Sequence, residues 1–179
     1  SKDELLQPKI SDDNDYYEKF GYCMFVNWTK CELRDILYYE QPGKYIVEST
    51  DYDNKYKTPV LTAGKSFILG YTNEESGIYC KLPCIIFDDF TTESKYVNFP
   101  FKVKSSAIKI LKNNSNVDLK YIYYIMQQIK VYFDTHKRYW ISDYSKREII
   151  IPSLKMQSKI VLVMDNMINY FNNIKAELD

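Results

Sequence analysis

The chain has few of the residues on which catalysis and metal binding most often depend. It contains a single histidine, His136, with no serine or cysteine nucleophile beside it, so a catalytic triad would need partners from elsewhere in the fold. The four cysteines have spacings that match no common zinc pattern and no dense disulfide framework: Cys23, Cys31, Cys80 and Cys84. We therefore expect reduced thiols and no bound metal.

Long apolar runs and glycine-rich loops are also missing. No stretch approaches the roughly 18 apolar residues that a membrane span requires, and no secretory signal peptide is visible. We expect a soluble, cytoplasmic protein without a membrane partner. Gly64-Lys65-Ser66 suggests a phosphate-binding loop, but Pro59 occupies the position where such a loop needs its first glycine. With no glycine-rich loop after a strand, we expect no nucleotide or methyl-donor cofactor.

The net charge of zero conceals two segments of opposite sign. Residues 1–54 carry 6 Lys and Arg against 12 Asp and Glu, whereas residues 101–150 carry 10 against 4. Such a basic segment can follow a phosphate backbone, because binding depends on the local density of Lys and Arg rather than on whole-chain charge. The alternative is that these charges are solvated and are balanced in space by the acidic N-terminal third.

Short β-branched and aromatic runs between turn residues predict a mostly antiparallel sheet in the middle of the chain. An apolar stripe with helical spacing predicts a core helix over residues 117–133, capped by Ser115 or Asn116. A capping-box pattern that starts at Thr29 predicts a short helix over residues 30–37. The expected strands lie at residues 45–47, 60–62, 67–69, 84–87, 95–97, 101–103 and 108–111.

A second long helix is predicted after Pro152-Ser153. Its apolar residues are separated by 4, 3, 4, 3 and 4 positions, which is the a/d seam of a coiled coil over almost three heptads. Because the flanking residues are polar, we favour a helix that leaves the domain and pairs with another helix over one that caps its own domain. The dimerisation seam consists of Ile160, Met164, Met167, Phe171, Ile174 and Leu178.

Several motifs follow one another in a characteristic order along the chain. They are a Trp...Leu-x-Asp-Ile opening (Trp28, Leu33, Asp35, Ile36), the stretches 58–71, 85–92 and 99–107, and a Pro...Gln-x-x-Ile helix start (Pro152, Gln157, Ile160). In this order they resemble the target recognition domain of the specificity (S) subunits of type I restriction-modification systems. The resemblance covers residues 27–179.

The resemblance implies an α/β (α+β) recognition domain that reads half of a bipartite DNA target, with a long helix that forms an antiparallel pair and sets the distance between half-sites. We expect a polar leader at residues 1–20, the recognition domain at residues 21–152, and the connecting helix at residues 153–179. A full subunit of this kind has two domains and two helices. The chain is therefore a fragment, or a half-length subunit that pairs with itself.

The resemblance also implies the partners. They are double-stranded DNA, the methyltransferase (M) and restriction (R) subunits, and a second recognition domain or a second copy of the chain. In such systems the methyl transfer and the cleavage belong to the partner subunits. We therefore expect no catalytic residue and no cofactor in this chain.

Three polar and basic segments could contact DNA, since phosphates need cations, hydroxyls or N–H groups and bases need paired donors and acceptors. The alternative for each is structural: a tight turn, a solvated edge strand and a solvated helix end. The candidate DNA-binding residues are Thr62, Lys65 and Ser66; Lys102, Lys104, Ser105 and Ser106; and His136, Lys137, Arg138 and Tyr139.

Two other functions are compatible with the sequence. Asp88 and Asp89 could hold Mg²⁺ in a small nuclease. The chain's 18 tyrosines could instead include exposed rings on which a single-stranded nucleic acid stacks its bases.

Overall fold

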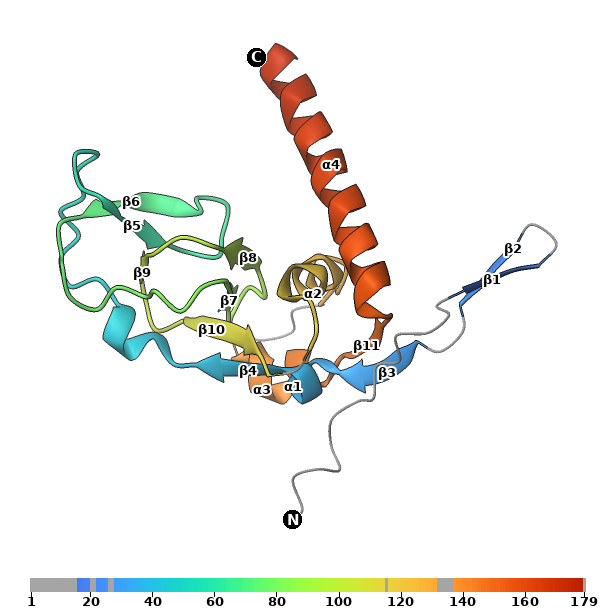
Figure 1. The fold of residues 1–179 in the computed structure, drawn as a ribbon. Helices are drawn as coiled ribbons and strands as arrows, with labels where there is room; N and C mark the ends of the chain where they lie inside the picture. Colours follow the sequence, from blue (N-terminus) through green and yellow to red (C-terminus); the bar gives the residue numbers. More distant parts are fainter. Residues whose placement is uncertain (1–15, 20–21, 26–27, 115, 132–136, 179) are drawn as a thin grey trace.

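The computed structural model describes residues 16–19, 22–25, 28–114, 116–131 and 137–178. A four-stranded sheet and a three-stranded sheet lie together, and a long C-terminal helix extends away from them (Figure 1). This arrangement confirms the predicted mixed α/β class with mainly antiparallel pairing and a C-terminal helix. No helix in the described part of the chain has an apolar stretch long enough to cross a membrane.

The central sheet has four antiparallel strands in the order β4-β10-β7-β8. Its two inner strands are buried over four consecutive residues each, because both faces of the sheet are covered there. Alternate residues therefore face opposite layers, so that Phe87 packs with the helices whereas Ile86 packs toward the second sheet. The strands are β4 (Leu37–Glu40), β7 (Cys84–Asp88), β8 (Ser94–Val97) and β10 (Ile108–Asn113).

The second sheet has three strands in the order β6-β5-β9. β5 and β6 form an antiparallel hairpin, and β9 lies parallel to β5. A predicted strand at residues 45–47 is wrong: a short 3₁₀ helix, η1 (Pro42–Tyr45), precedes Ile46, which forms only an isolated bridge. The strands are β5 (Thr58–Leu61), β6 (Ile68–Thr72) and β9 (Lys102–Val103).

The helix predicted over residues 30–37 is also wrong. Thr29–Glu32 is instead a strand, β3, which pairs antiparallel with β11 (Glu148–Ile151). Only Leu33–Ile36 forms a helix, α1, and its capping contact is the backbone N–H of residue 32 donating to the Asp35 carboxylate at 2.8 Å. Pairing of β3 with a distant strand has outweighed the local capping pattern. The helix cap therefore lies at Glu32, three residues later than the sequence predicted.

The core helix α2 (Leu119–Met126) starts later than expected and has a different cap. The Asp118 carboxylate accepts two backbone N–H groups of the first turn, at 2.8 and 3.2 Å. Ser115 or Asn116 as the cap is therefore wrong. The apolar face was predicted correctly where the helix forms, since Ile122 is fully buried.

α2 also ends earlier than residues 117–133 would allow. The Tyr144 hydroxyl donates a hydrogen bond of 2.9 Å to the Met126 carbonyl, which is the acceptor that a further helical turn would use. The end of the predicted helix, residues 132–133, lies outside the described residues.

The remaining elements include the predicted C-terminal helix, α4 (Leu154–Leu178), which begins after Pro152-Ser153 as expected. Its only fully buried residue among those described is Gln157, whose side-chain N–H donates to the Pro152 carbonyl and whose Oε1 accepts the Asp118 N–H, both at 2.8 Å. Gln157 thus fastens the base of α4 to the start of α2. The others are β1 (Tyr16–Lys19), β2 (Tyr22–Phe25), α3 (Tyr139–Ser142) and the 3₁₀ helix η2 (Tyr144–Lys146).

The expected polar leader, residues 1–20, falls mostly outside the described residues. Its last part forms β1, which pairs with β2 in a hairpin. The boundaries proposed for the recognition domain, residues 21–152, and for the connecting helix, residues 153–179, remain predictions.

Candidate nucleic-acid interface

The first predicted DNA-binding segment, residues 62–66, is the turn between β5 and β6. The Thr62 N–H donates to the Phe67 carbonyl at 3.0 Å, and the Thr62 hydroxyl accepts the Gly64 N–H and contacts the Ser66 carbonyl, both at 3.2 Å. The Thr62 side chain therefore closes the turn. Lys65 and the Ser66 side chain remain exposed at its tip.

The second segment lies beside this turn. The Lys104 N–H donates to the Leu61 carbonyl at 3.0 Å, immediately before the turn begins. The Lys104 side chain is exposed, and its ammonium lies 5.9 Å from the centre of the Tyr52 ring. Two loops that are separated by about forty residues in sequence therefore present their lysines at the same edge.

The third segment joins the same edge through Ser106. Nη1 of Arg138 lies 3.5 Å from the Ser106 carbonyl, and the Asp89 N–H donates to the Ala107 carbonyl at 2.9 Å. Ser105 is partly committed locally, because its hydroxyl accepts the Ala107 N–H at 3.4 Å. We call residues 62–66, 104–106 and 137–138 the recognition rim.

Lys102, which was predicted as a candidate DNA-binding residue beside Lys104, does not belong to the rim. Its side chain is 3% exposed, with its ammonium 2.6 Å from Glu74 and 2.8 Å from the Ser76 carbonyl. The loop that supplies these partners folds over β9 with a positive φ of 63° at Gly77, where a side chain would strike the Lys44 carbonyl. Lys102 is a buried structural cation.

Of the other three predicted residues, one is buried, one lies outside the described part of the chain and one is exposed. Tyr139 is buried, and its backbone N–H donates to the Asp89 carbonyl at 2.8 Å. His136 lies outside the described residues. Lys137 is exposed, with its ammonium 5.4 Å from the centre of the Tyr139 ring.

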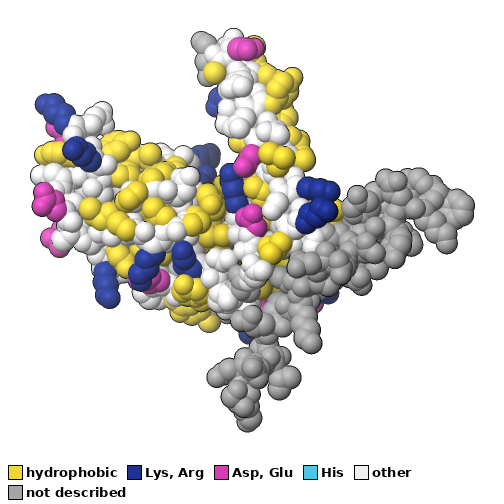
Figure 2. Space-filling view, viewed as in Figure 1, with side chains coloured by type: hydrophobic (Ala, Val, Ile, Leu, Met, Phe, Trp, Pro, Cys, Tyr) yellow, Lys and Arg dark blue, Asp and Glu magenta, His cyan; other side chains and the backbone are white. Residues whose placement is uncertain are grey.

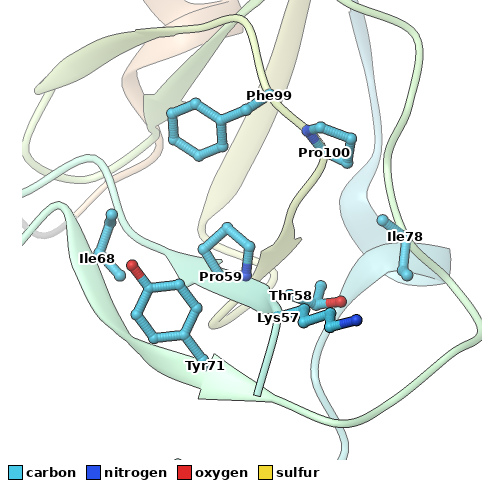
Figure 3. Close-up of a pocket in the computed structure, with 8 residues that line it drawn as sticks. All are labelled: Lys57, Thr58, Pro59, Ile68, Tyr71, Ile78, Phe99 and Pro100. Carbon is cyan, nitrogen blue, oxygen red and sulfur yellow. The ribbon is translucent and has the colours of Figure 1, made fainter. Parts of the chain in front are cut away.

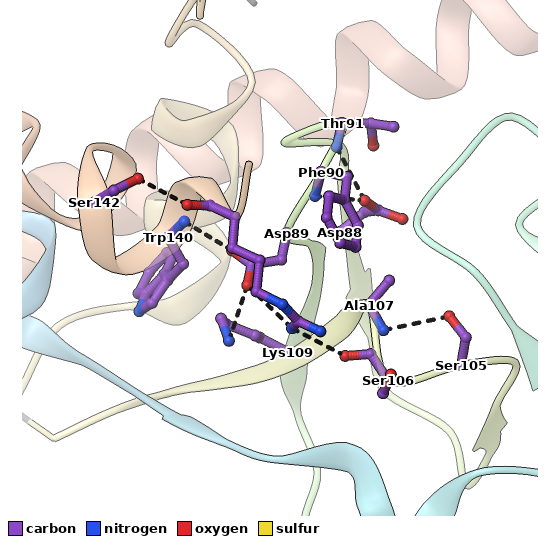
Figure 4. Close-up of polar contacts among 11 residues, drawn as sticks. Asp88, Asp89, Phe90, Thr91, Ser105, Ser106, Ala107, Lys109, Trp140 and Ser142 are labelled. Carbon is purple, nitrogen blue, oxygen red and sulfur yellow. Dashed lines mark hydrogen bonds and ion pairs between the residues drawn. The ribbon is translucent and has the colours of Figure 1, made fainter. Parts of the chain in front are cut away.

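Asp88 and Asp89, the residues of the nuclease alternative, are both engaged in structural contacts (Figure 4). One Asp88 oxygen accepts the Phe90 and Thr91 N–H groups at 2.9 and 3.0 Å, which forms a tight turn. The Asp89 side chain is 1% exposed and lies 3.0 Å from the Lys109 ammonium. The geometry gives no support to a metal pair here, and the described residues contain no group of three potential ligands.

The residues that hold the Arg138 segment of the rim in place were not predicted from the sequence. Asp89 also accepts the Trp140 N–H at 2.8 Å, so one carboxylate links β7 to the start of α3 (Figure 4). The Arg138 guanidinium lies 5.3 Å from the centre of the Phe90 ring. No local sequence pattern indicates these contacts, because they join residues 48 to 51 positions apart.

An apolar hollow of about 430 Å³ lies on the side of the β5–β6 hairpin (Figure 3). Tyr71, Pro59 and Phe99 face it, with Lys57 and Thr58 at one end. Figure 2 shows apolar side chains spread over this sheet, with Lys and Arg scattered among them rather than gathered on the viewed face. Nothing in the structure shows what covers this hollow.

The predicted seam of α4 is exposed over most of its length. Ile160 packs against the core, but Met167 is 49%, Phe171 62% and Leu178 82% exposed. Figure 2 shows apolar side chains in a stripe along one side of this helix. A stripe of this extent is typical of a helix that packs against a partner.

Comparisons with known proteins agree with this geometry. Residues 26–179 match the family described as the type I restriction modification DNA specificity domain. The chain is 46% identical over 177 residues to the type I restriction enzyme EcoR124I/EcoR124II specificity subunit of Escherichia coli, an alignment that covers 92% of this chain and 43% of that protein.

Solved structures show a similar fold. The crystal structure of the type I restriction-modification system S subunit from M. genitalium superposes with a TM-score of 0.65 at 18% identity, over 96% of this chain and 44% of the other. A structure reported on complex assembly and conformational transition of the type I R-M system gives a TM-score of 0.62 at 12% identity, over 90% and 43%. The chain spans less than half the length of these relatives.

Proposed function

The chain belongs to the type I restriction modification DNA specificity domain family, and from this we propose that it recognises a specific double-stranded DNA sequence. It is a specificity subunit, or half of one, and directs partner methyltransferase and restriction subunits to a bipartite target. Such a reader works in the cytoplasm, with the DNA. The observation that carries the proposal is the convergence of three polar segments on one rim in a chain of this family.

The rim offers the groups that a DNA duplex requires. Lys65, Lys104 and Lys137 supply cations for phosphates, Ser66 and Ser106 supply hydroxyl groups, and Arg138 supplies a further cation. Three phosphate contacts correspond to a slope of roughly −3 in a plot of log affinity against log salt concentration. Binding by one such domain is weak by itself and strengthens when a second domain is attached.

α4 provides the attachment. It is anchored at its base to α2, and its outer part exposes the Met167 and Phe171 side chains. We propose that this stripe forms a coiled coil with the helix of a second recognition domain or of a second copy. The two rims then read the two halves of one target.

We propose that the chain recognises DNA without catalysing a reaction itself, and that its partner subunits carry out methyl transfer and cleavage. The test is competition for the chain between duplex and single-stranded DNA, followed by incubation of the duplex with Mg²⁺ and S-adenosylmethionine. We expect preference for the duplex and no change in the DNA. Stronger competition by single strands would indicate a single-strand binder, and Mg²⁺-dependent cutting that Asp88→Ala abolishes would indicate a nuclease.

A further inference from the structure

Arg138 differs from the other cations of the rim because its side chain is held from behind. Its Nη1 lies 3.5 Å from Asp89 Oδ2 and 3.5 Å from the Ser106 carbonyl, and its guanidinium lies 5.3 Å from the Phe90 ring centre. The Arg138 side chain is nevertheless 50% exposed. One edge of the guanidinium is thus fixed by the protein while the rest faces outward.

The backbone that carries Arg138 is fixed as well. The Ser142 hydroxyl donates to the Arg138 carbonyl at 2.7 Å, and the next two N–H groups donate to the carbonyl and the carboxylate of Asp89, both at 2.8 Å. Asp89 therefore holds the main chain directly after Arg138 and also contacts the Arg138 side chain. A fixed geometry of this kind lowers the entropy cost of a directional contact.

Asp89 and the two cations around it carry a net positive charge. Lys109 lies 3.0 Å from the Asp89 carboxylate and is itself 98% buried, so this pair alone is balanced. Among the described residues, Asp89 Oδ2 receives no well-aligned hydrogen bond and is compensated by the two cations. Arg138 is the second cation on one carboxylate, which leaves one positive charge at the surface. This charge is available to an acceptor outside the protein.

A phosphate would not need this arrangement. Phosphate contacts carry no sequence information and can be made by exposed lysines such as Lys137, Lys104 and Lys65. An oriented guanidinium is useful for contacts with base edges, because bases are distinguished by the positions of their donors and acceptors. Its paired donors match the O6 and N7 acceptors of guanine in the major groove. Among the described residues, the Nη2 and Nε groups of Arg138 have no acceptor of their own.

We propose, on the basis of the proposed function, that Arg138 reads a guanine in the target and that Asp89 and Phe90 are positioning residues that hold its guanidinium for that contact. This assigns the rim one specificity-determining side chain among cations that bind without regard to sequence.

The test is selection of binding sites from a random duplex library by the full chain and by its variants. The wild-type chain is expected to enrich a motif that contains a guanine. Arg138→Lys and Arg138→Ala are expected to lose the preference at that one position and to keep the rest of the motif. Lys137→Ala is the adjacent control and should weaken all duplexes alike, and Arg147→Ala, which removes another carboxylate-paired arginine, should change neither.

Base analogues then separate base reading from phosphate contact. Replacing the selected guanine with 7-deazaguanine removes the N7 acceptor and should weaken the wild-type chain by roughly tenfold, with no further loss in Arg138→Ala. Phe90→Leu changes a 40% exposed side chain and should reduce discrimination at the same guanine several-fold. Asp89→Asn should do likewise while keeping an acceptor for the Trp140 N–H.

Each outcome decides a separate claim. If Arg138→Ala weakens all duplexes equally and leaves the motif unchanged, Arg138 is a phosphate contact and this inference is overturned while the proposed function stands. If the wild-type chain enriches no duplex motif, the proposed function fails and the inference fails with it.

Discussion

The Asp165 carboxylate of α4 lies 2.6 Å from the Lys120 ammonium of α2 and accepts a hydrogen bond from the Tyr124 hydroxyl. Partial burial favours the protonated acid, but the hydrogen bonds from Lys120 and Tyr124 and the charge of Lys120 outweigh it, so the pKa of Asp165 lies below its ordinary value. Burial, and then the bond to Asp165, raise the pKa of Tyr124. These contacts hold the first half of α4 against α2.

Asp165→Asn should lower the free energy of unfolding by about 1 to 2 kcal/mol at neutral pH, because it removes the charge that Lys120 and Tyr124 contact. Because the pKa of Asp165 is lowered in the folded chain, the Asp165 contribution to the free energy of unfolding is complete above pH 3.8. It is lost as the pH falls further, through the lowered pKa. Urea unfolding at pH 7 and pH 3 measures it. The difference between the two chains should be smaller at pH 3 than at pH 7, whereas a constant difference would show that the contact acts through shape alone; Asn169→Ala, at an exposed position, is the control.

Met167→Asp with Phe171→Asp should disrupt the pairing of α4, since each substitution would bury a charge in the coiled-coil seam. Asn169→Asp with Asn173→Asp adds the same charge on the other side of the helix and serves as the matched control. Light scattering of the wild-type chain should give twice the 21.4 kDa of one chain, and only the seam variant should return to the single mass. An unchanged mass in the seam variant would mean that α4 does not pair through this stripe.

Lys65→Ala and Lys104→Ala should each weaken binding to every duplex and reduce the salt slope by roughly one, as expected for a lost phosphate contact. Lys155→Ala and Lys175→Ala, at exposed positions on α4, should have little effect. Titrations at several salt concentrations distinguish the two sets. Equal effects from both would show that only total charge matters.

Glu74→Ala should destabilise the fold by roughly 3 kcal/mol or more, because it leaves the Lys102 ammonium buried without its partner. The pKa of Glu74 is lowered, since hydrogen bonds from Lys102 and from the N–H groups of Ser49 and Glu48 outweigh its partial burial. Combining Glu74→Gln with Lys102→Met should restore most of the stability in urea unfolding, with duplex affinity intact. Loss of DNA binding in that stable double variant would return Lys102 to the interface.

The parts of the fold that depend on neighbouring residues in sequence could be predicted, and those that depend on distant partners could not. β7, β10 and the start of α4 follow from apolar runs and from Pro152-Ser153. β3 escaped prediction because its partner is β11, more than a hundred residues away. A local capping pattern cannot reveal such a pairing.

The same distinction holds for the candidate site. Lysines at turns, such as Lys65, were placed correctly at the surface because turns are exposed. Lys102 was misplaced because a loop from residues 74–77 covers it. The support that Asp89 gives to Arg138 was missed for the same reason, since only the tertiary fold brings them together.

The most direct measurement is methylation sequencing of DNA from cells that contain the partner methyltransferase subunit with and without this chain. The account predicts methylation at one defined target sequence that appears only when the chain is present. Removing cations of the rim, with Lys65→Ala and Lys104→Ala together, should reduce it. Methylation at the same sites without the chain, or none at any defined sequence with it, would contradict the claim that the chain confers DNA specificity.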